Sequence, residues 1–221
     1  MALEKSTAFL KAIKKNNNKE WFDKNKPKYL EAKEEFEVFV QSLITALNKF
    51  DKKISGDMKA KDCVFRIYKD VRFSKDKTPY KTHFGAYFSP GGKKSNAAGY
   101  YLHFQPGNLF IAGGNWQPEP PQLSAIRQEI DYNGDKLVKI LKAKPFSTYF
   151  KGLSDEDKLK TVPKGFDKEH KHIELLKLRS FIAYHKMSDS KLKGKELEKT
   201  AAAAFKSMFP LIQFLREASD N

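Results

Sequence analysis

Apolar residues recur along this chain at two different spacings, and each spacing predicts a different secondary structure. From residue 27 to residue 50 they recur every three or four positions, at Tyr29, Ala32, Phe36, Phe39, Val40, Leu43, Leu47 and Phe50. This stripe predicts one long amphipathic helix that begins at Pro27. Shorter stripes predict further helices at 121–130, 137–141, 173–178 and 195–215. We expect an interruption of the last one near Pro210, because proline has no amide hydrogen to donate.

Between residues 63 and 113 apolar and polar residues alternate, which is typical of strands with one buried face. The alternating stretches are 63–74, 80–88, 100–105 and 109–113, and 181–186 is a candidate fifth strand. We therefore predict an α+β fold, in which N-terminal and C-terminal helices flank an antiparallel meander of about four to five strands. We expect a single domain over 1–221, with a helical part at 1–55, the sheet at 60–115 and a mainly helical part at 120–221.

The segment 65–85 combines charge, aromatic rings and turn residues more densely than any other stretch. Two of the five arginines of the chain lie in it, Arg66 and Arg72. On a strand, the alternation places Phe65, Ile67, Val71 and Phe73 on a packing face and places Arg66, Tyr68, Asp70, Arg72 and Ser74 on a polar face. The two arginines would lie roughly 20 Å apart on a regular strand, so they would not share one small anion.

These observations predict an anion-binding site centred on Arg72, whose guanidinium would hold a phosphate or carboxylate group with two parallel hydrogen bonds. In this hypothesis Asp70 orients Arg72, and hydroxyls and further positive charges complete the site. The predicted ligand-binding residues are Arg66, Tyr68, Asp70, Arg72, Ser74, Lys75, Lys77, Tyr80, Lys81, His83 and Arg127. Lys81 and His83 join the polar face only if the strand of 80–88 pairs with the preceding one in a suitable register.

A catalytic role has weaker support in the sequence. His83 is a candidate general base that Asp70 or Asp76 would orient, since histidine titrates near neutrality. The alternative is a hydrogen-bonded histidine of the sheet. No nucleophile-elbow pattern surrounds Ser74, and the paired His170 and His172 are too few ligands for a zinc site, so we predict no metal and no cofactor. Whether the protein is an enzyme stays open at this point.

The motif Arg-Ile-Tyr-Lys-Asp-Val-Arg-Phe-Ser-Lys-Asp-Lys-Thr-Pro-Tyr-Lys, at 66–81, resembles the hallmark of an uncharacterised family of bacterial and fungal proteins, domain of unknown function 2461. Trp21-Phe22, Gly99-Tyr100-Tyr101, Gly113-Gly114 and Pro163-Lys164-Gly165-Phe166 also match the family pattern. Two residues depart from it, since Lys69 stands where many relatives have arginine and Lys171 where they have proline. The resemblance implies a single intracellular domain and no established activity.

The overall charge adds a second hypothesis. The formal net charge is +15, and residues 59–94 hold ten lysines and arginines against three aspartates. Such a surface attracts polyphosphates, so non-specific nucleic-acid binding is an alternative function. A third reading treats the Arg/Asp motif as an internal salt-bridge network of a structural or interaction protein. The lone Cys63 on a packing face and the lack of a long apolar run predict a cytoplasmic protein without a membrane partner. The oligomeric state is not predicted.

Overall fold

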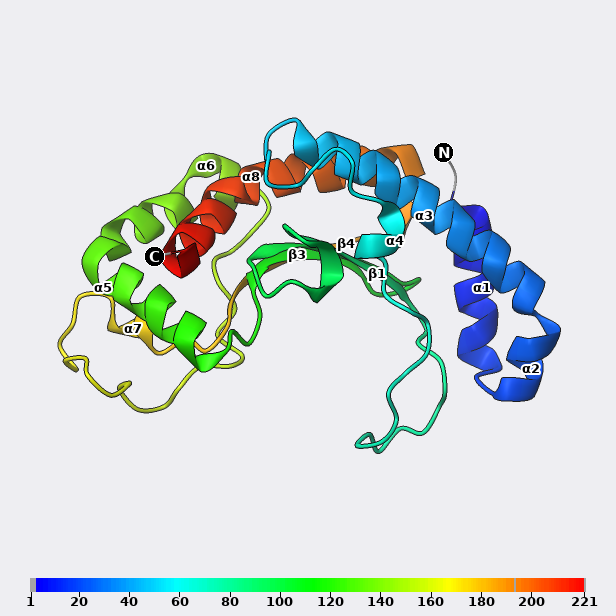
Figure 1. The fold of residues 1–221 in the computed structure, drawn as a ribbon, viewed down its shortest axis with the longest axis horizontal. Coiled ribbons are helices and arrows are strands. Elements are labelled where there is room, and N and C mark those ends of the chain that lie inside the picture. Colours follow the sequence, from blue (N-terminus) through cyan, green and yellow to red (C-terminus); the bar gives the residue numbers. More distant parts are fainter. Residues whose placement is uncertain (1–2, 193, 221) are drawn as a thin grey trace. The chain divides into compact units, whose positions relative to one another are not determined.

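The computed structural model describes residues 3–192 and 194–220, and it confirms the α+β prediction (Figure 1). Its α-helices are α1 (Glu4–Lys15), α2 (Lys19–Lys24), α3 (Lys26–Asn48), α4 (Ala60–Cys63), α5 (Pro120–Lys142), α6 (Lys144–Ser147), α7 (Ile173–Leu176) and α8 (Gly194–Asp220). Two short 3-10 helices are η1 (Gly92–Lys94) and η2 (Asp189–Leu192). None of these described helices combines the length and the apolar character needed to cross a membrane.

The sheet has four antiparallel strands, which follow one another in the order β1-β2-β3-β4. They are β1 (Phe84–Phe88), β2 (Gly99–Phe104), β3 (Leu109–Asn115) and β4 (Phe181–Met187). The prediction of a meander is confirmed, and the stretch predicted as a fifth strand forms β4. The predicted strand at 63–74 is wrong: this segment makes only isolated bridges, Val64 with Ala86 and Tyr68 with Tyr80.

The chain divides into two compact units. The first contains Met1–Lys94, Tyr101–Ile111 and Lys186–Ala203, and the second contains Ser95–Tyr100, Ala112–His185 and Ala204–Asn221. In the first unit α3 packs on the sheet, because Phe36 places its ring 5.2 Å from that of Phe84 and 5.7 Å from that of Phe104, between ring centroids. All three side chains are at most 2% exposed, as the helical stripe in the sequence predicts.

The second unit packs around the C-terminal part of α8. The ring of Phe205 lies 5.2 Å from that of Tyr100 on β2, and both side chains are fully buried. One prediction about the helices in this unit is wrong. The helix α8 continues through Pro210. The proline removes only one amide donor, and the apolar face of the helix is buried on both sides of it, which holds the helix together. The helices predicted at 121–130 and 137–141 are confirmed as two helical segments of α5, which non-helical backbone at Asn133 separates by a kink.

Candidate functional site

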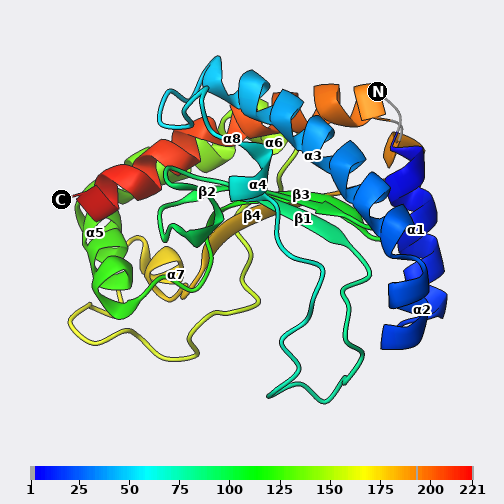
Figure 2. The ribbon, with the colours of Figure 1, turned by 45° about the vertical axis from the view of Figure 1, so that its right-hand side comes forward.

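Residues 65–83 form a long hairpin that extends away from the sheet, as the loop between α4 and β1 shows in Figures 1 and 2. Three backbone hydrogen bonds join its arms: Phe65 N to Gly85 O (2.9 Å), Lys81 N to Ile67 O (2.7 Å) and Lys69 N to Pro79 O (2.9 Å). Between the first two bonds, the returning arm has two residues more than the outgoing arm. The extra residues make this part of the returning arm a bulge, which contains Thr82 and His83.

The base of the hairpin is anchored to the N-terminal helices. The Asn17 side chain donates to Tyr80 O (2.8 Å) and accepts from Tyr80 N (3.1 Å). Both backbone groups of Tyr80 are therefore hydrogen-bonded, as they would be beside a neighbouring strand. Phe22 of α2 stacks on Tyr80 with 4.0 Å between ring centroids, and Tyr68 meets the edge of the Phe22 ring. Tyr80 is 4% exposed and Tyr68 47% exposed. The structure therefore places Tyr80, a predicted ligand contact, in a packed position against Phe22 and Tyr68.

Hydrogen bonds to the Asp76 carboxylate stabilise the tip of the hairpin. Asp76 accepts from Lys69 Nζ (2.5 Å), from Thr78 N (2.9 Å) and from Thr78 Oγ1 (2.7 Å), while Ser74 Oγ accepts from Asp76 N (3.1 Å). The hydrogen bond from Lys69 contributes most to holding the pKa of Asp76 well below its ordinary value. These bonds account for Ser74 and Asp76 as loop-forming residues. Among the described residues the Asp76 carboxylate binds Lys69 and Thr78, and the predicted contact with His83 is not formed.

Arg72 is engaged by its neighbour Asp70. Its Nε donates to Asp70 Oδ1 (2.9 Å) and its Nη2 to Asp70 Oδ2 (2.6 Å), so the two hydrogen bonds that we expected for an anion are made to this carboxylate. The pair is largely solvent-exposed, and the guanidinium lowers the pKa of Asp70. Lys77 donates to Val71 O (3.0 Å), and Lys75 is exposed.

Phe73 contradicts the predicted packing face, because 94% of its surface is exposed. The alternation of apolar and polar residues maps onto two faces only while the chain stays in a ladder. After Lys69 the outgoing arm leaves the ladder, so the side chains of Phe73 and Arg72 both lie in solvent, with the guanidinium carbon 5.8 Å from the centre of the Phe73 ring.

Arg66 and Lys81 lie at the base of the hairpin. Among the described residues, neither of these cations has a carboxylate in ion-pair contact. The Lys81 ammonium lies 5.5 Å from the centre of the Phe65 ring. Burial lowers the pKa of Lys81, and repulsion by Arg66 lowers it further, so the two side chains act on each other. Arg66 also lowers the pKa of Asp70. We call Arg66 and Lys81 the cation pair.

A row of rings lies beside the cation pair, on the sheet face opposite to Phe36. His83, His103 of β2 and Phe110 of β3 stand in sequence across the strands, with ring centroids 4.1 Å and 4.5 Å apart. Tyr101 stands next to His103 on β2 and comes so near to β1 that a Cβ at position 85 would lie 2.8 Å from its hydroxyl, which Gly85 avoids.

Four side chains form one hydrogen-bonded chain along this face. Gln105 Nε2 donates to Thr82 Oγ1 (3.0 Å), which turns Gln105 Oε1 toward His103 Nε2 (2.9 Å). In this arrangement His103 carries its proton on Nε2, and its Nδ1 accepts from the Tyr101 hydroxyl (3.1 Å). Both nitrogens of His103 are thus used. We call these four residues, together with His83, the histidine cluster.

His83 differs from His103 because neither of its ring nitrogens has a hydrogen-bond partner among the residues that the structure describes. Burial lowers the pKa of His83 to about 3, and the nearby His103, Lys81 and Lys69 lower it in the same direction. Burial also lowers the pKa of His103 and raises that of Tyr101 to about 12. At neutral pH the histidine cluster is therefore uncharged, and the positive charge next to it belongs to the cation pair.

The structure brings together three of the predicted residues, Arg66, Lys81 and His83, and places the others elsewhere. Arg127 is bound in the second unit, where its Nε donates to Leu176 O (2.9 Å) and its Nη2 to Leu178 O (3.2 Å). Sequence reasoning missed Tyr101, His103 and Gln105. The alternation within the correctly predicted strand at 100–105 was the signal that could have placed these three side chains on one face.

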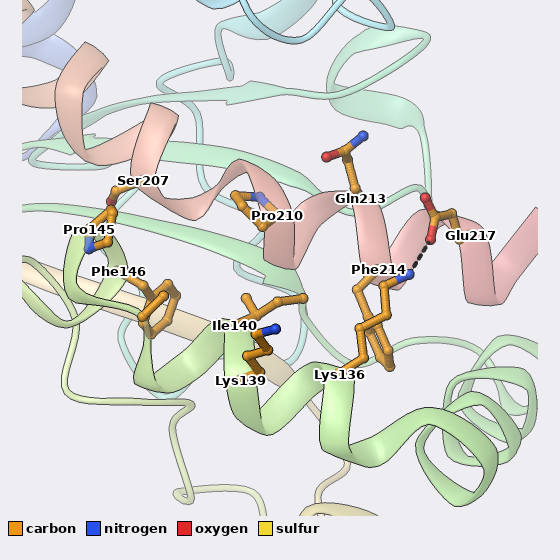
Figure 3. A pocket seen from close by; sticks show the side chains of 11 residues that line it. Lys136, Lys139, Ile140, Pro145, Phe146, Ser207, Pro210, Gln213, Phe214 and Glu217 are labelled. Carbon is orange, nitrogen blue, oxygen red and sulfur yellow. Dashed lines mark hydrogen bonds and ion pairs between the residues drawn. The ribbon is translucent and has the colours of Figure 1, made fainter.

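A separate hollow of about 500 Å³ lies in the second unit, between α5, α6 and α8 (Figure 3). Its walls are mainly apolar, with Ile140, Phe146 and Phe214 among the lining side chains. At one end Lys136 forms an ion pair with Glu217 (3.0 Å). In this hollow Lys136 and Glu217 neutralise each other, whereas the cation pair has no carboxylate partner among the described residues and lies beside the uncharged histidine cluster, so we place the candidate site at the base of the hairpin.

A family model described as "Conserved hypothetical protein (DUF2461)" matches residues 5–214. The comparison with curated proteins and the comparison with solved structures gave no match.

Proposed function

The chain belongs to the DUF2461 family, whose description names no activity, and we propose from the geometry of its site that it binds a small oxyanion, phosphate-bearing or carboxylate, at the base of the hairpin. The cation pair supplies the positive charge, and the histidine cluster forms the floor. This proposal keeps the anion site of the sequence analysis but moves its centre from Arg72 to Lys81.

The observation that carries the proposal is the pair of adjacent cations without a carboxylate in ion-pair contact. A buried or half-buried cation is costly unless a counter-charge accompanies it, and the pKa of Lys81 is already lowered by burial and by Arg66. An anion between the two side chains would remove this penalty. Arg72 and Lys69, in contrast, each have their own carboxylate partner, Asp70 and Asp76.

Neutralising either cation of the pair is expected to weaken anion binding. In Lys81→Met and in Arg66→Gln, the affinity for inorganic sulfate should fall at least about tenfold, since a hydrogen bond to a charged group contributes about 1.5–3 kcal/mol. The dissociation constants are measured by NMR titration at one fixed salt concentration. Arg72→Gln is the matched control, because it removes an equal charge from the same hairpin and should leave the affinity within about twofold.

An equal loss in Arg72→Gln would assign the binding to the general positive field of the hairpin. That result would favour the nucleic-acid alternative, which remains a prediction from charge and would show a salt dependence spread over many lysines.

A second role is supported by the bonds of Asp76, which suggest that the motif also serves to hold the hairpin tip in one conformation. In Asp76→Ala the tip loses its bonds to Lys69 and Thr78. Tryptic cleavage after Lys75 or Lys77 should then become several-fold faster, while sulfate affinity at the base of the hairpin stays unchanged. Unchanged cleavage in this variant would show that the tip does not depend on Asp76.

A further inference from the structure

His83 is the one member of the histidine cluster whose nitrogens have no partner among the described residues, and Lys81 of the cation pair acts on it. Its ring packs at a tilt of 32° against the ring of His103, whose own nitrogens are both used by Tyr101 and Gln105. A proton arriving at this cluster therefore has a free acceptor at His83, whereas His103 would have to break a hydrogen bond to take it up.

The surroundings of His83 disfavour its protonation in the free protein. The groups that act on it are Lys81 in its own segment, Lys69 on the outgoing arm and His103 on β2. Two of these are cations and the third is a neutral ring. Lys69 is paired with Asp76, so the uncompensated charge that acts on His83 is that of Lys81, on which Arg66 acts in turn.

A bound anion reverses this balance, because its negative charge would lie against Lys81 and Arg66 and would offset the repulsion by Lys81 of a proton on His83. With His83 protonated, the site would present three positive charges. Two negative charges on the ligand match this arrangement better than one, because each favours the added proton.

We propose that the anion of this site is doubly charged, of the phosphate-monoester class, and that it binds together with one proton from solvent, which His83 takes up on a ring nitrogen. This inference rests on the proposed function, and it adds the charge of the ligand and the residue that selects it. A singly charged carboxylate would gain less from the third positive charge and should bind more weakly.

The test uses inorganic sulfate, which is doubly charged and takes up no proton at neutral pH, so that any proton uptake belongs to the protein. Binding constants are measured by NMR titration from about pH 5 to pH 7 at constant ionic strength. The pKa of His83 is about 3 without an anion and must be higher in the complex. Between these two values affinity should fall tenfold for each unit of pH increase, because one proton is taken up on binding. Acetate should bind at least about tenfold more weakly than sulfate at pH 5.

In His83→Gln the slope should disappear while weaker sulfate binding remains. His170→Gln is the control, since His170 lies in the second unit, where it pairs with Asp131, and its loss should leave the slope unchanged. A second measurement needs no variant: the ring signals of His83 in the unaltered protein should titrate at a higher pH with saturating sulfate than without it.

Each outcome decides a different question. A tenfold slope that His83→Gln abolishes supports the inference. Sulfate binding that is lost in Lys81→Met but independent of pH overturns proton uptake by His83 and leaves the proposed function standing. Absence of sulfate binding throughout this pH range overturns the proposed function and this inference with it.

Discussion

Replacing Phe22 by alanine is expected to destabilise the protein by about 3–5 kcal/mol, as truncation of a buried phenylalanine does. Phe22 is 1% exposed and connects α2 to the hairpin through its stacking on Tyr80 and its contact with Tyr68. The cavity would lie under the base of the hairpin, next to the Tyr80 backbone that Asn17 holds. Chemical denaturation followed by circular dichroism measures the free energy of unfolding.

Phe73→Ala is the matched control for this variant, because it removes the same side chain from the tip of the same hairpin. Phe73 is 94% exposed, so its removal should change the free energy of unfolding by less than about 0.5 kcal/mol. Equal losses in the two variants would contradict the assignment of the hairpin base as the anchored end. The difference between them measures how strongly the N-terminal helices hold the base of the candidate site.

The sequence predicted the helices and strands well where a regular spacing lasts for several turns or residues. The stripe from Tyr29 to Leu47 corresponds to α3, and its members at Phe36 and Phe39 are fully buried. The alternating stretches at 80–88, 100–105, 109–113 and 181–186 each overlap one strand of the sheet. In these segments the apolar positions of the pattern supply buried side chains, such as Phe84, Leu102 and Phe181, so the pattern and the structure have the same cause.

The prediction failed at 63–74, where the alternation is equally regular in sequence. Hydrogen bonds of Asp76 and Asp70 to nearby groups compete there with a strand ladder, and the outgoing arm leaves the sheet. Position along a strand therefore gave the wrong face for Phe73, which is exposed instead of packed. The bulge at Thr82 and His83 depends on the register of two arms, and a register cannot be derived from one arm alone.

Part of the candidate site was nevertheless accessible to sequence reasoning. Arg66, Lys81 and His83 were predicted as ligand-binding residues from their types and their proximity in the motif. His103 and Tyr101 lie about 20 residues further on, and only the pairing of β1 with β2 brings them to His83. Asp70 was predicted correctly as the partner of Arg72. Only the two short distances between them show that this pairing already engages the guanidinium.

Gly114→Ala is expected to have the largest effect on stability of the substitutions considered, a loss of at least about 4 kcal/mol, which is in the range of the most damaging single substitutions. Gly114 has φ of 126°, a backbone conformation that side chains with a Cβ rarely adopt. A Cβ here would lie 1.9 Å from the carbonyl oxygen of Phe181, so β4 would have to move away from β3.

Gly165→Ala separates the two causes of this loss, since Gly165 also has a positive φ, of 92°, but no atom lies within 4 Å of a Cβ built on it. Its cost is that of the backbone alone, about 1–2 kcal/mol. Denaturation of both variants under the same conditions should therefore give a difference of at least about 2 kcal/mol. Similar values for the two would mean that β3 and β4 adjust easily at Phe181, and the close approach of these strands would then not be what requires glycine at position 114.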